Sequence, residues 1–328
     1  MVQEAFDAVA YEAHLRSLSE ASVRLSFNAF TDVPWDDPAY AWREDDPQFV
    51  LSEADVIGAH PWYQALPLER QIAIGMFRFA QIAKVGRQFE QVLIGGMMHH
   101  LIGMRTGNPE FRYAMHEVTE ETHHIQMFQE AVNRAHERFG IDPQGAPTYF
   151  QRLAPFITQA GLYLPTVFFI GILAGEEPID HLQKSMIRDG GRQPLISRIM
   201  QIHIAEEARH ISFAHEWLAK NVAAAGPVKR FFLSLAYPAA MWWLCSMIMK
   251  PTRRDLRAMG IPRRVAREMW WRSPASDAHR REMFGDVRLL ADRLGIRRGP
   301  ARLLWTLLRI DGRPSRYRGE THERDLAA

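Results

Sequence analysis

The chain has 328 residues, of which 47% are hydrophobic and 24% are charged, a composition typical of a globular protein with a sizeable core. Cys245 is the only cysteine, so the chain can form no intramolecular disulfide and can hold no zinc or iron–sulfur site built on several thiolates. The lack of disulfides fits a reducing cytoplasm. The N-terminal segment is acidic and lacks the apolar core of a signal peptide, so a cytoplasmic protein is expected.

The net charge of +2 conceals an uneven distribution. Residues 250–328 carry 20 Lys and Arg against 10 Asp and Glu, whereas residues 1–249 carry 20 against 28. A basic segment of this kind can face anionic lipid, an acidic protein or simply solvent. No aromatic interleaving or nucleic-acid motif accompanies it, so we expect no nucleic-acid partner. Peripheral membrane or carrier-protein contact through this segment stays open.

Proline and glycine breaks divide the chain into long helical segments. Helices are expected over residues 1–27, 66–103, 110–139, 195–223 and 228–249. A polar loop over 31–48 follows the first of them, and a helical region broken by prolines extends to about residue 188.

Strand-like alternation is almost absent, so the predicted fold class is all-α. Long helices with short breaks indicate a helical bundle. We expect residues 1–249 to form this bundle. Residues 250–328 are expected to form a basic extension of two or three shorter helices, packed on the same domain.

One uncharged stretch, Phe231–Met249, is at the lower limit of length for a membrane span. Pro238 lies in its middle, and the chain offers no second strong candidate. A buried helix or a dimer-interface helix is therefore the favoured interpretation, and a homodimer is expected.

The most specific pattern in the chain is His203-x-x-x-Glu207-x-x-His210. At about 100° per residue, these three side chains share one face of a helix. Two imidazoles and a carboxylate on one face suit a transition metal such as iron.

A second string, Glu-Glu-Thr-His-His, allows two registers. Glu121 with His124 is one, and Glu120 with His123 is the other. The face of the first pair continues with Phe128 and is apolar, so it must point inward. We therefore choose Glu121 and His124, and expect Glu120 and His123 to lie at the boundary or the surface.

Two further helices should each supply a carboxylate, because a two-metal bundle site uses Glu from four helices. Glu90 is the only Glu on the apolar stripe of residues 66–103. It either pairs with Arg87 or binds metal, since a lone buried carboxylate is costly, and the two histidine strings favour metal. The fourth helix offers Glu176 and Glu177, which helical phase alone does not separate.

Together these motifs resemble the AurF-like diiron oxygenases, the p-aminobenzoate N-oxygenase family of ferritin-like proteins. The resemblance implies a metal site of seven residues, with a third histidine, His203, one turn before the last Glu. The family's spacing between the third Glu and this histidine fits Glu176 better than Glu177. The implied ligands are Glu90, Glu121, His124, Glu176, His203, Glu207 and His210.

The same resemblance implies two Fe ions, O2 as co-substrate and an amine substrate, with arylamine N-oxygenation to hydroxylamine, nitroso or nitro products. No residues match those that bind substrate in the arylamine enzymes. The chain has no flavin or nicotinamide fingerprint, so electrons are expected from an external ferredoxin or reductase.

Two other functions compete with this one. A diiron hydroxylase or desaturase acting on a lipid-like or carrier-bound substrate would suit the apolar stretch and the basic tail. A non-enzymatic, ferritin-like iron-binding protein is disfavoured by the length of the chain and its basic C-terminal region.

Overall fold

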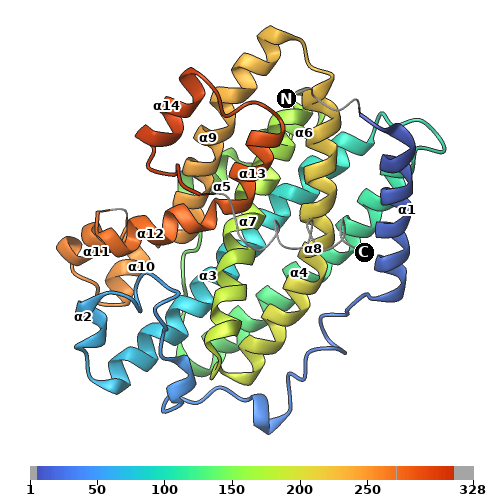
Figure 1. Ribbon diagram of the computed structural model, residues 1–328. Helices are drawn as coiled ribbons and strands as arrows, with labels where there is room; N and C mark the ends of the chain where they lie inside the picture. Colours follow the sequence, from blue (N-terminus) through green and yellow to red (C-terminus); the bar gives the residue numbers. More distant parts are fainter. Residues whose placement is uncertain (1–5, 271, 314–328) are drawn as a thin grey trace, which may run out of the picture.

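The computed structural model describes residues 6–270 and 272–313, and within these ranges all regular secondary structure is helical (Figure 1). The all-α, ferritin-like prediction is confirmed. Four long helices form the bundle, with α3 packed on α4 and α7 packed on α8. Their bounds are Leu68–Leu101 for α3, Pro109–Phe139 for α4, Pro165–Asp189 for α7 and Pro194–Ala223 for α8.

The ends of α4 show why the breaks in the sequence were informative. The Asn108 side chain accepts a hydrogen bond from the backbone N–H of Glu110, and Pro109 occupies the first turn, where no donor is needed. At the other end Gly140 adopts a φ of 65°, which closes the helix. Each of the predicted long helices ends within a few residues of its expected limit.

Two further helices cover the bundle. The N-terminal α1 (Ala8–Arg24) packs on α4 and α8, and α9 (Pro227–Met249) packs on α7 (Figure 1). Short elements fill the connections. They are η1 (Pro38–Tyr40), η2 (Pro47–Phe49) and α2 (Pro61–Gln64) before α3, and α5 (Thr148–Ile157) and α6 (Ala160–Tyr163) before α7.

The C-terminal region contains more helices than the sequence indicated. Five short helices replace the predicted two or three, because segments of six to ten residues complete too few turns to display a clear period. Both α12 and α13 pack on α7, and α14 packs on α9. The five are α10 (Arg253–Ala258), α11 (Arg263–Met269), α12 (Pro274–Met283), α13 (Gly285–Arg293) and α14 (Pro300–Leu307). Residues 314–328 of the predicted extension lie outside the described residues.

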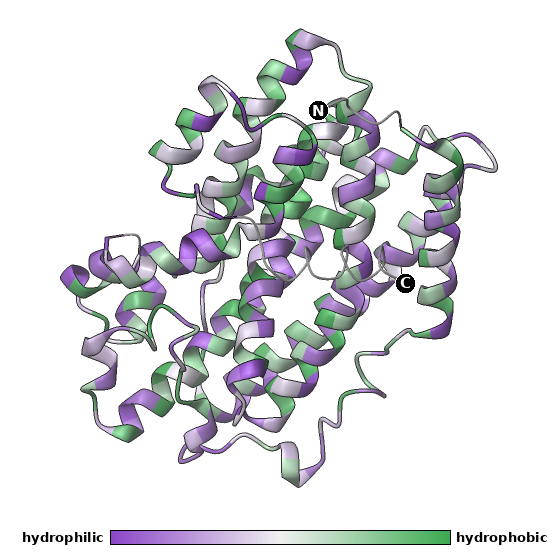
Figure 2. Cartoon of the chain, viewed as in Figure 1, coloured by the Kyte–Doolittle hydropathy of each residue, from purple (hydrophilic) through white to green (hydrophobic). Residues whose placement is uncertain are grey.

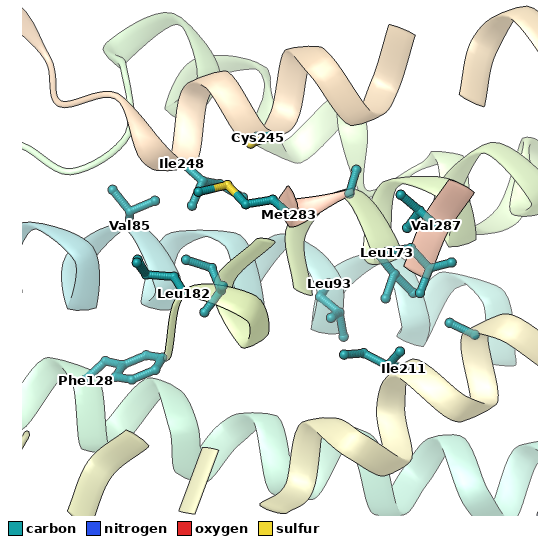
Figure 3. Close-up of a cluster of buried hydrophobic side chains, with 14 of the residues drawn as sticks. Val85, Leu93, Phe128, Leu173, Leu182, Ile211, Cys245, Ile248, Met283 and Val287 are labelled. Carbon is teal, nitrogen blue, oxygen red and sulfur yellow. The ribbon is translucent and has the colours of Figure 1, made fainter. Parts of the chain in front are cut away.

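The main hydrophobic core joins the bundle to this outer layer. Figure 3 shows Val85 and Leu93 of α3 facing Leu173 and Leu182 of α7, with Ile248 of α9 above them. Met283 and Val287, from the C-terminal helices, lie in the same cluster. The two parts of the chain therefore share one core.

One helical segment, Pro227–Ala258, is long and apolar enough to cross a membrane by length and composition alone, and 44% of its most apolar window is buried. Its inner side belongs to the core, where Tyr237 and Met241 are at most 1% exposed. Its outer side carries Phe231 and Phe232, which are 48% and 63% exposed. Figure 2 shows hydrophobic residues along this helix on more than one side. The helix is thus a core helix with one uncovered apolar side.

Candidate metal centre

The four long helices bring all seven predicted site residues together in the interior of the bundle. None of the seven is more than 6% exposed. They are Glu90 of α3, Glu121 and His124 of α4, Glu176 of α7, and His203, Glu207 and His210 of α8.

Glu207 lies at the centre of the cluster. Its Oε1 is 3.2 Å from Nδ1 of His210, 3.4 Å from Nδ1 of His124 and 3.6 Å from Nε2 of His203. One carboxylate oxygen thus faces three imidazoles from two helices. A carboxylate in this position can bridge two metal ions.

Glu121 spans the cluster in the same way from α4. Its Oε2 is 3.3 Å from Nδ1 of His124, and its Oε1 is 3.0 Å from Nδ1 of His210. The two Glu-x-x-His pairs therefore face each other, and each carboxylate reaches both of their histidines.

Glu90 and Glu176 close the side of the cluster next to His203. Nε2 of His203 is 3.3 Å from Oε1 of Glu90. Donor atoms of Glu90, His124 and His203 lie within 4.8 Å of one another, and so do those of Glu176, His203 and Glu207. Residues of all four bundle helices thus meet at this edge, and each group of three is spaced closely enough to hold one cation.

The structure separates the two acidic residues that helical phase could not. Glu176 belongs to the cluster. Oε1 of Glu177 instead lies 2.7 Å from Nε2 of His215, on the next turn of α8 after His210. The two neighbouring carboxylates therefore have different partners.

The prediction that Glu120 lies at the boundary or the surface is wrong. Glu120 is 3% exposed, and its Oε2 is 2.8 Å from Nε2 of His210. Glu206 has the same relation to the other helix, because its Oε2 is 2.8 Å from Nε2 of His124. His123 is only partly buried, and the backbone N–H of Ala29 lies 3.4 Å from its Nδ1.

These contacts give a separate role to each Glu of the two acidic pairs. The second Glu of each pair, Glu121 or Glu207, joins the cluster. The first, Glu120 or Glu206, holds the outer ring nitrogen of a histidine on the opposite helix. A metal-binding histidine commonly donates its second N–H to a carboxylate, which fixes the ring and raises its basicity.

Both outer carboxylates are held from a further layer. Nη2 of Arg209 donates to Oε1 of Glu120 at 2.8 Å, and the backbone N–H of Phe27 donates to Oε1 of Glu206 at 3.2 Å. The same arginine nitrogen reaches the backbone carbonyl of Leu25. The end of α1 and the segment after it therefore cover this side of the centre.

Burial and neighbouring charges shift the pKa values of these groups in different directions. Burial raises the pKa of the Glu90 and Glu176 carboxyls well above the usual range, and Glu121 and Glu207 add repulsion. Against the effect of burial, His210 and His203 hold the pKa of Glu207 well below its usual range. Burial lowers the pKa of His203 to about 4.

The other two histidines shift in the opposite direction. Burial acts against their charged forms, but hydrogen bonds to Glu121, Glu206 and Glu207 raise the pKa of His124 well above normal. Glu207, followed by Glu120, does the same for His210. Without metal, protons on these histidines therefore balance part of the buried negative charge.

The donor set fits two divalent cations. Four carboxylates carry four negative charges, which two such ions neutralise, and the three imidazoles add neutral donors. Oε2 of Glu90 and Oε2 of Glu207 are buried and have no hydrogen-bond partner within residues 6–270 and 272–313. Buried polar atoms rarely stay unpaired in this way. Carboxylate and imidazole donors with few waters are typical of iron sites in helical bundles.

Sequence reasoning also missed Glu117, one turn before Glu121 on α4. It is 1% exposed, and neither of its carboxylate oxygens has a hydrogen-bond partner among the residues that the structure describes. Burial raises the pKa of Glu117 well above its usual range, and Glu121 and Glu207 reinforce the shift. Its position four residues before Glu121, on the inward face, was the available signal.

Comparison with known proteins agrees with this geometry. The family model described as P-aminobenzoate N-oxygenase AurF matches residues 8–295. The chain is 46% identical over 323 residues to the uncharacterized protein Mb0909 of Mycobacterium bovis and to the uncharacterized protein Rv0885 of Mycobacterium tuberculosis. Each alignment covers 98% of this chain and 94% of the relative.

Proposed function

Because the chain belongs to the p-aminobenzoate N-oxygenase AurF family and is therefore a diiron oxygenase, we propose that it inserts oxygen into the nitrogen of an amine. In this proposal the seven clustered residues hold two Fe ions. The observation that carries it is the place of His203, a third imidazole whose Nε2 faces Glu90 and Glu207 at 3.3 and 3.6 Å.

The proposed reaction uses O2 as co-substrate. One oxygen atom forms a bond to the amine nitrogen and replaces an N–H bond with N–OH. The other leaves as water, and two electrons and two protons enter from outside. The chain carries no flavin or nicotinamide motif, so an external ferredoxin or reductase supplies the electrons. A second such step, followed by loss of water, would give the nitroso product. The nitroso nitrogen has no N–H bond, so the nitro product would need direct addition of one more oxygen atom to nitrogen, with the same O2, electrons and protons.

When bound, the two iron ions would supply the redox chemistry that activates O2. The protein contributes a dry, rigid environment, because the seven donors are nearly inaccessible to water. The carboxylates of Glu120 and Glu206 keep the Nδ1 atoms of His210 and His124 pointing inward. At neutral pH His203 offers a neutral nitrogen, since burial lowers its pKa to about 4.

Metal analysis and product analysis together test the proposal. Purified protein should contain about two Fe per chain. The reduced protein, given labelled O2 and a panel of arylamines and other amines, should form products whose mass increases by one labelled oxygen on nitrogen. One zinc without iron, or oxygen found only on carbon, would contradict it.

The Glu121→Ala variant should lose both iron and activity, because Glu121 faces both Glu-x-x-His histidines. The His123→Ala variant is its matched control. His123 lies two residues away on α4, but its Nδ1 faces the backbone N–H of Ala29. Equal loss of activity in both variants would point to damaged folding rather than to the centre.

An apolar cavity next to the cluster favours a second candidate, hydroxylation or desaturation of a lipid-like or carrier-bound substrate. The cavity is lined by Ile82, Ile179 and Met200. Incubation with alkyl substrates that lack nitrogen separates the two candidates. Oxygen in those products, with none in amine products, would favour the second.

We also propose that the uncovered side of α9 is a contact surface. Phe231 and Phe232 lie on it, directly after Lys229 and Arg230. A homodimer would cover these rings, and peripheral contact with a membrane or a carrier protein would use the basic residues as well. Sedimentation of the wild type and of a Phe231→Ser/Phe232→Ser variant tests the dimer, which the variant should lose.

A further inference from the structure

A narrow internal cavity leads from the metal centre along the bundle. Its volume is about 40 Å³, and its lining is mainly apolar. A smaller cavity of about 20 Å³ lies against Glu90, Glu176 and His203. The two share Gly86 and Ile179 as lining residues, so they adjoin at this point.

The cavity follows one stripe of α3. Arg78, Ile82, Gly86 and Glu90 are spaced by four residues, so each lies next to the previous one in a stripe that winds gradually around the helix. At 1.5 Å per residue, Arg78 lies about 18 Å along the axis from Glu90. The absence of a side chain at Gly86 leaves room for the Phe128 ring, which would be 3.0 Å from an added Cβ.

Helices α7 and α8 form the other two walls of the cavity, and their lining residues also lead toward the metal centre. On α7, Gln183 and Ile179 lead back to Glu176, and on α8, Ile196 and Ile199 lead forward to His203. On each of the three helices a row of lining residues thus leads to a residue of the centre. The end of the cavity away from the metal is the one that carries charge.

Two arginines line this distant end. Arg78 is fully buried, and the Arg192 side chain is 7% exposed. Nε of Arg78 donates to Oδ2 of Asp55 at 2.8 Å, and its Nη1 donates to Oε1 of Gln81. Nη1 of Arg192 donates to the backbone carbonyl of Val50. These partners fix both guanidinium groups in place.

Each arginine nevertheless keeps one unused donor. Nη2 of Arg78 and Nε of Arg192 are buried and have no hydrogen-bond partner within the described ranges 6–270 and 272–313. Asp55 does not pair with these two donors. Its Oδ2 accepts from Nε of Arg78 and its Oδ1 accepts from the backbone N–H of Ile57, each at 2.8 Å. Unpaired buried guanidinium donors are costly and call for an acceptor.

We propose that Arg78 and Arg192 bind the carboxylate of an elongated, apolar substrate whose opposite end reaches the metal centre. This rests on the proposed function in so far as the ligand is the substrate whose amine is oxidised. The recognition itself follows from the cavity. Arginine pairs well with carboxylates, and two donors match two carboxylate oxygens.

The charge of this end selects a monoanion. Two guanidinium groups and the Asp55 carboxylate leave one net positive charge at the cavity wall. Asp189 is 3.9 Å from Arg192, but it is 42% exposed and screened by solvent. A dianionic phosphate would leave a buried charge without a partner.

The length of the cavity selects an elongated body. The acid-binding end and the metal end are separated by about 18 Å of α3, which exceeds the reach of a compact molecule at both ends. The cavity, of about 40 Å³, has room for about three water molecules. A ligand must therefore displace flexible side chains, and Met186 and Met200 are among the lining residues.

Calorimetric titration of the iron-loaded, full-length protein with decanoate and with decanamide tests the proposal. The two probes share length and shape and differ in the anionic group. Decanoate should bind more tightly by about 10- to 100-fold, the value of a charge-assisted hydrogen bond. The absorption of the diferric centre should stay unchanged, since the acid binds at the arginines.

Variants of Arg192 test whether this arginine causes the preference for decanoate over decanamide. Arg192→Gln should bind acid and amide alike, and Arg192→Lys, which keeps the charge, should retain part of the preference even if the Gln variant folds poorly. The matched control is Arg198→Gln, in the first turns of α8, whose Nε donates to the backbone carbonyl of Asp32 instead. It should keep the full preference.

Four results would overturn the proposal. They are equal affinity for acid and amide in the wild type, no binding of either probe, a preference that survives Arg192→Gln, and an iron absorption spectrum altered by decanoate. None of them depends on turnover. A protein that prefers decanoate but oxidises no amine would refute the proposed N-oxygenation and leave the acid-binding site standing.

Discussion

Nε2 of His210 on α8 lies 2.8 Å from Oε2 of Glu120 on α4. The reciprocal contact, 2.8 Å between Nε2 of His124 on α4 and Oε2 of Glu206 on α8, is its counterpart across the centre. Each helix therefore orients the histidine of the other. In each copy of the Glu-Glu-x-x-His motif, the second Glu and the His belong to the centre, and the first Glu holds the His of the other copy.

Replacing these supports should weaken the metal site without emptying it. A Gln at position 120 or 206 still accepts a hydrogen bond but no longer carries the charge that makes the imidazole more basic. We expect iron affinity to fall about 10- to 100-fold in Glu120→Gln and in Glu206→Gln. Competition with a chelator measures this, and Glu130→Gln, which alters an ion pair with Arg134 on the same helix, should match the wild type.

The sequence could not reveal the burial of Glu120, for a definite reason. Helical phase distinguishes the inward from the outward face by apolar neighbours, and the face of Glu120 continues with Glu130 and Arg134. That face is nevertheless covered near Glu120, because α1 packs across α4 and α8. Which helix covers which polar face depends on tertiary packing, and periodicity holds no information about it.

Other parts of the centre were accessible from the sequence because their neighbours are apolar. The phase of α4 correctly placed Glu121 and His124 inward, and Glu90 was the only Glu on the apolar stripe of α3. Glu176 and Glu177 are both buried, so burial could not separate them. Their difference lies in His215, which takes the second carboxylate and whose place needs the packing of α7 on α8.

The third histidine should set the electronic properties of the centre more than its stability. We expect His203→Ala to fold and to retain iron, because six other donors remain, but to show altered Mössbauer parameters and at least ten-fold slower turnover, a loss of about 1.4 kcal/mol in transition-state stabilisation. His123→Ala again serves as the control. Unaltered Mössbauer parameters in His203→Ala would remove this residue from the metal.

The metal-free protein should become less stable as pH rises above neutrality. Carboxylate partners raise the pKa values of both His124 and His210 against the effect of burial. Glu121 contributes most at His124, and Glu207 contributes most at His210. The protonated histidines stabilise the fold fully below their unfolded pKa of about 6.5, and this contribution is lost as pH rises through the higher folded pKa.

The buried carboxyls do not reverse this dependence of stability on pH. Glu90, whose pKa is raised by burial, also loses its contribution as pH rises, whereas the lowered pKa of Glu207 matters only in acid. Urea unfolding from pH 6 to pH 9 measures the effect. Iron loading should flatten the profile, since metal replaces the protons; parallel profiles with and without iron would refute this account.

Glu117 should be a stability cost in the metal-free protein at neutral and higher pH. Burial raises its pKa, so ionising it in the folded state is unfavourable. Glu117→Gln should therefore unfold at higher urea concentration than the wild type at pH 8, and the difference should shrink toward pH 4, near the unfolded pKa of about 4.3. Glu137→Gln, at an exposed position of α4, should show no such trend.

The close crossing of α3 and α6 provides a test of the fold independent of metal. A Cβ added to Gly161 would lie 1.8 Å from the backbone oxygen of Gly96 and 2.6 Å from its carbonyl carbon. Backbone atoms cannot rotate away as a side chain can, so the two helices must separate. We expect Gly161→Ala to lower the free energy of unfolding by about 1–3 kcal/mol, the usual effect of adding atoms to a well-packed protein interior. Gly103→Ala makes the same chemical change where nothing lies within 4 Å, and it should leave the free energy of unfolding within about 0.5 kcal/mol of the wild type. Equal midpoints for both variants would show that α6 does not lie against α3 as described.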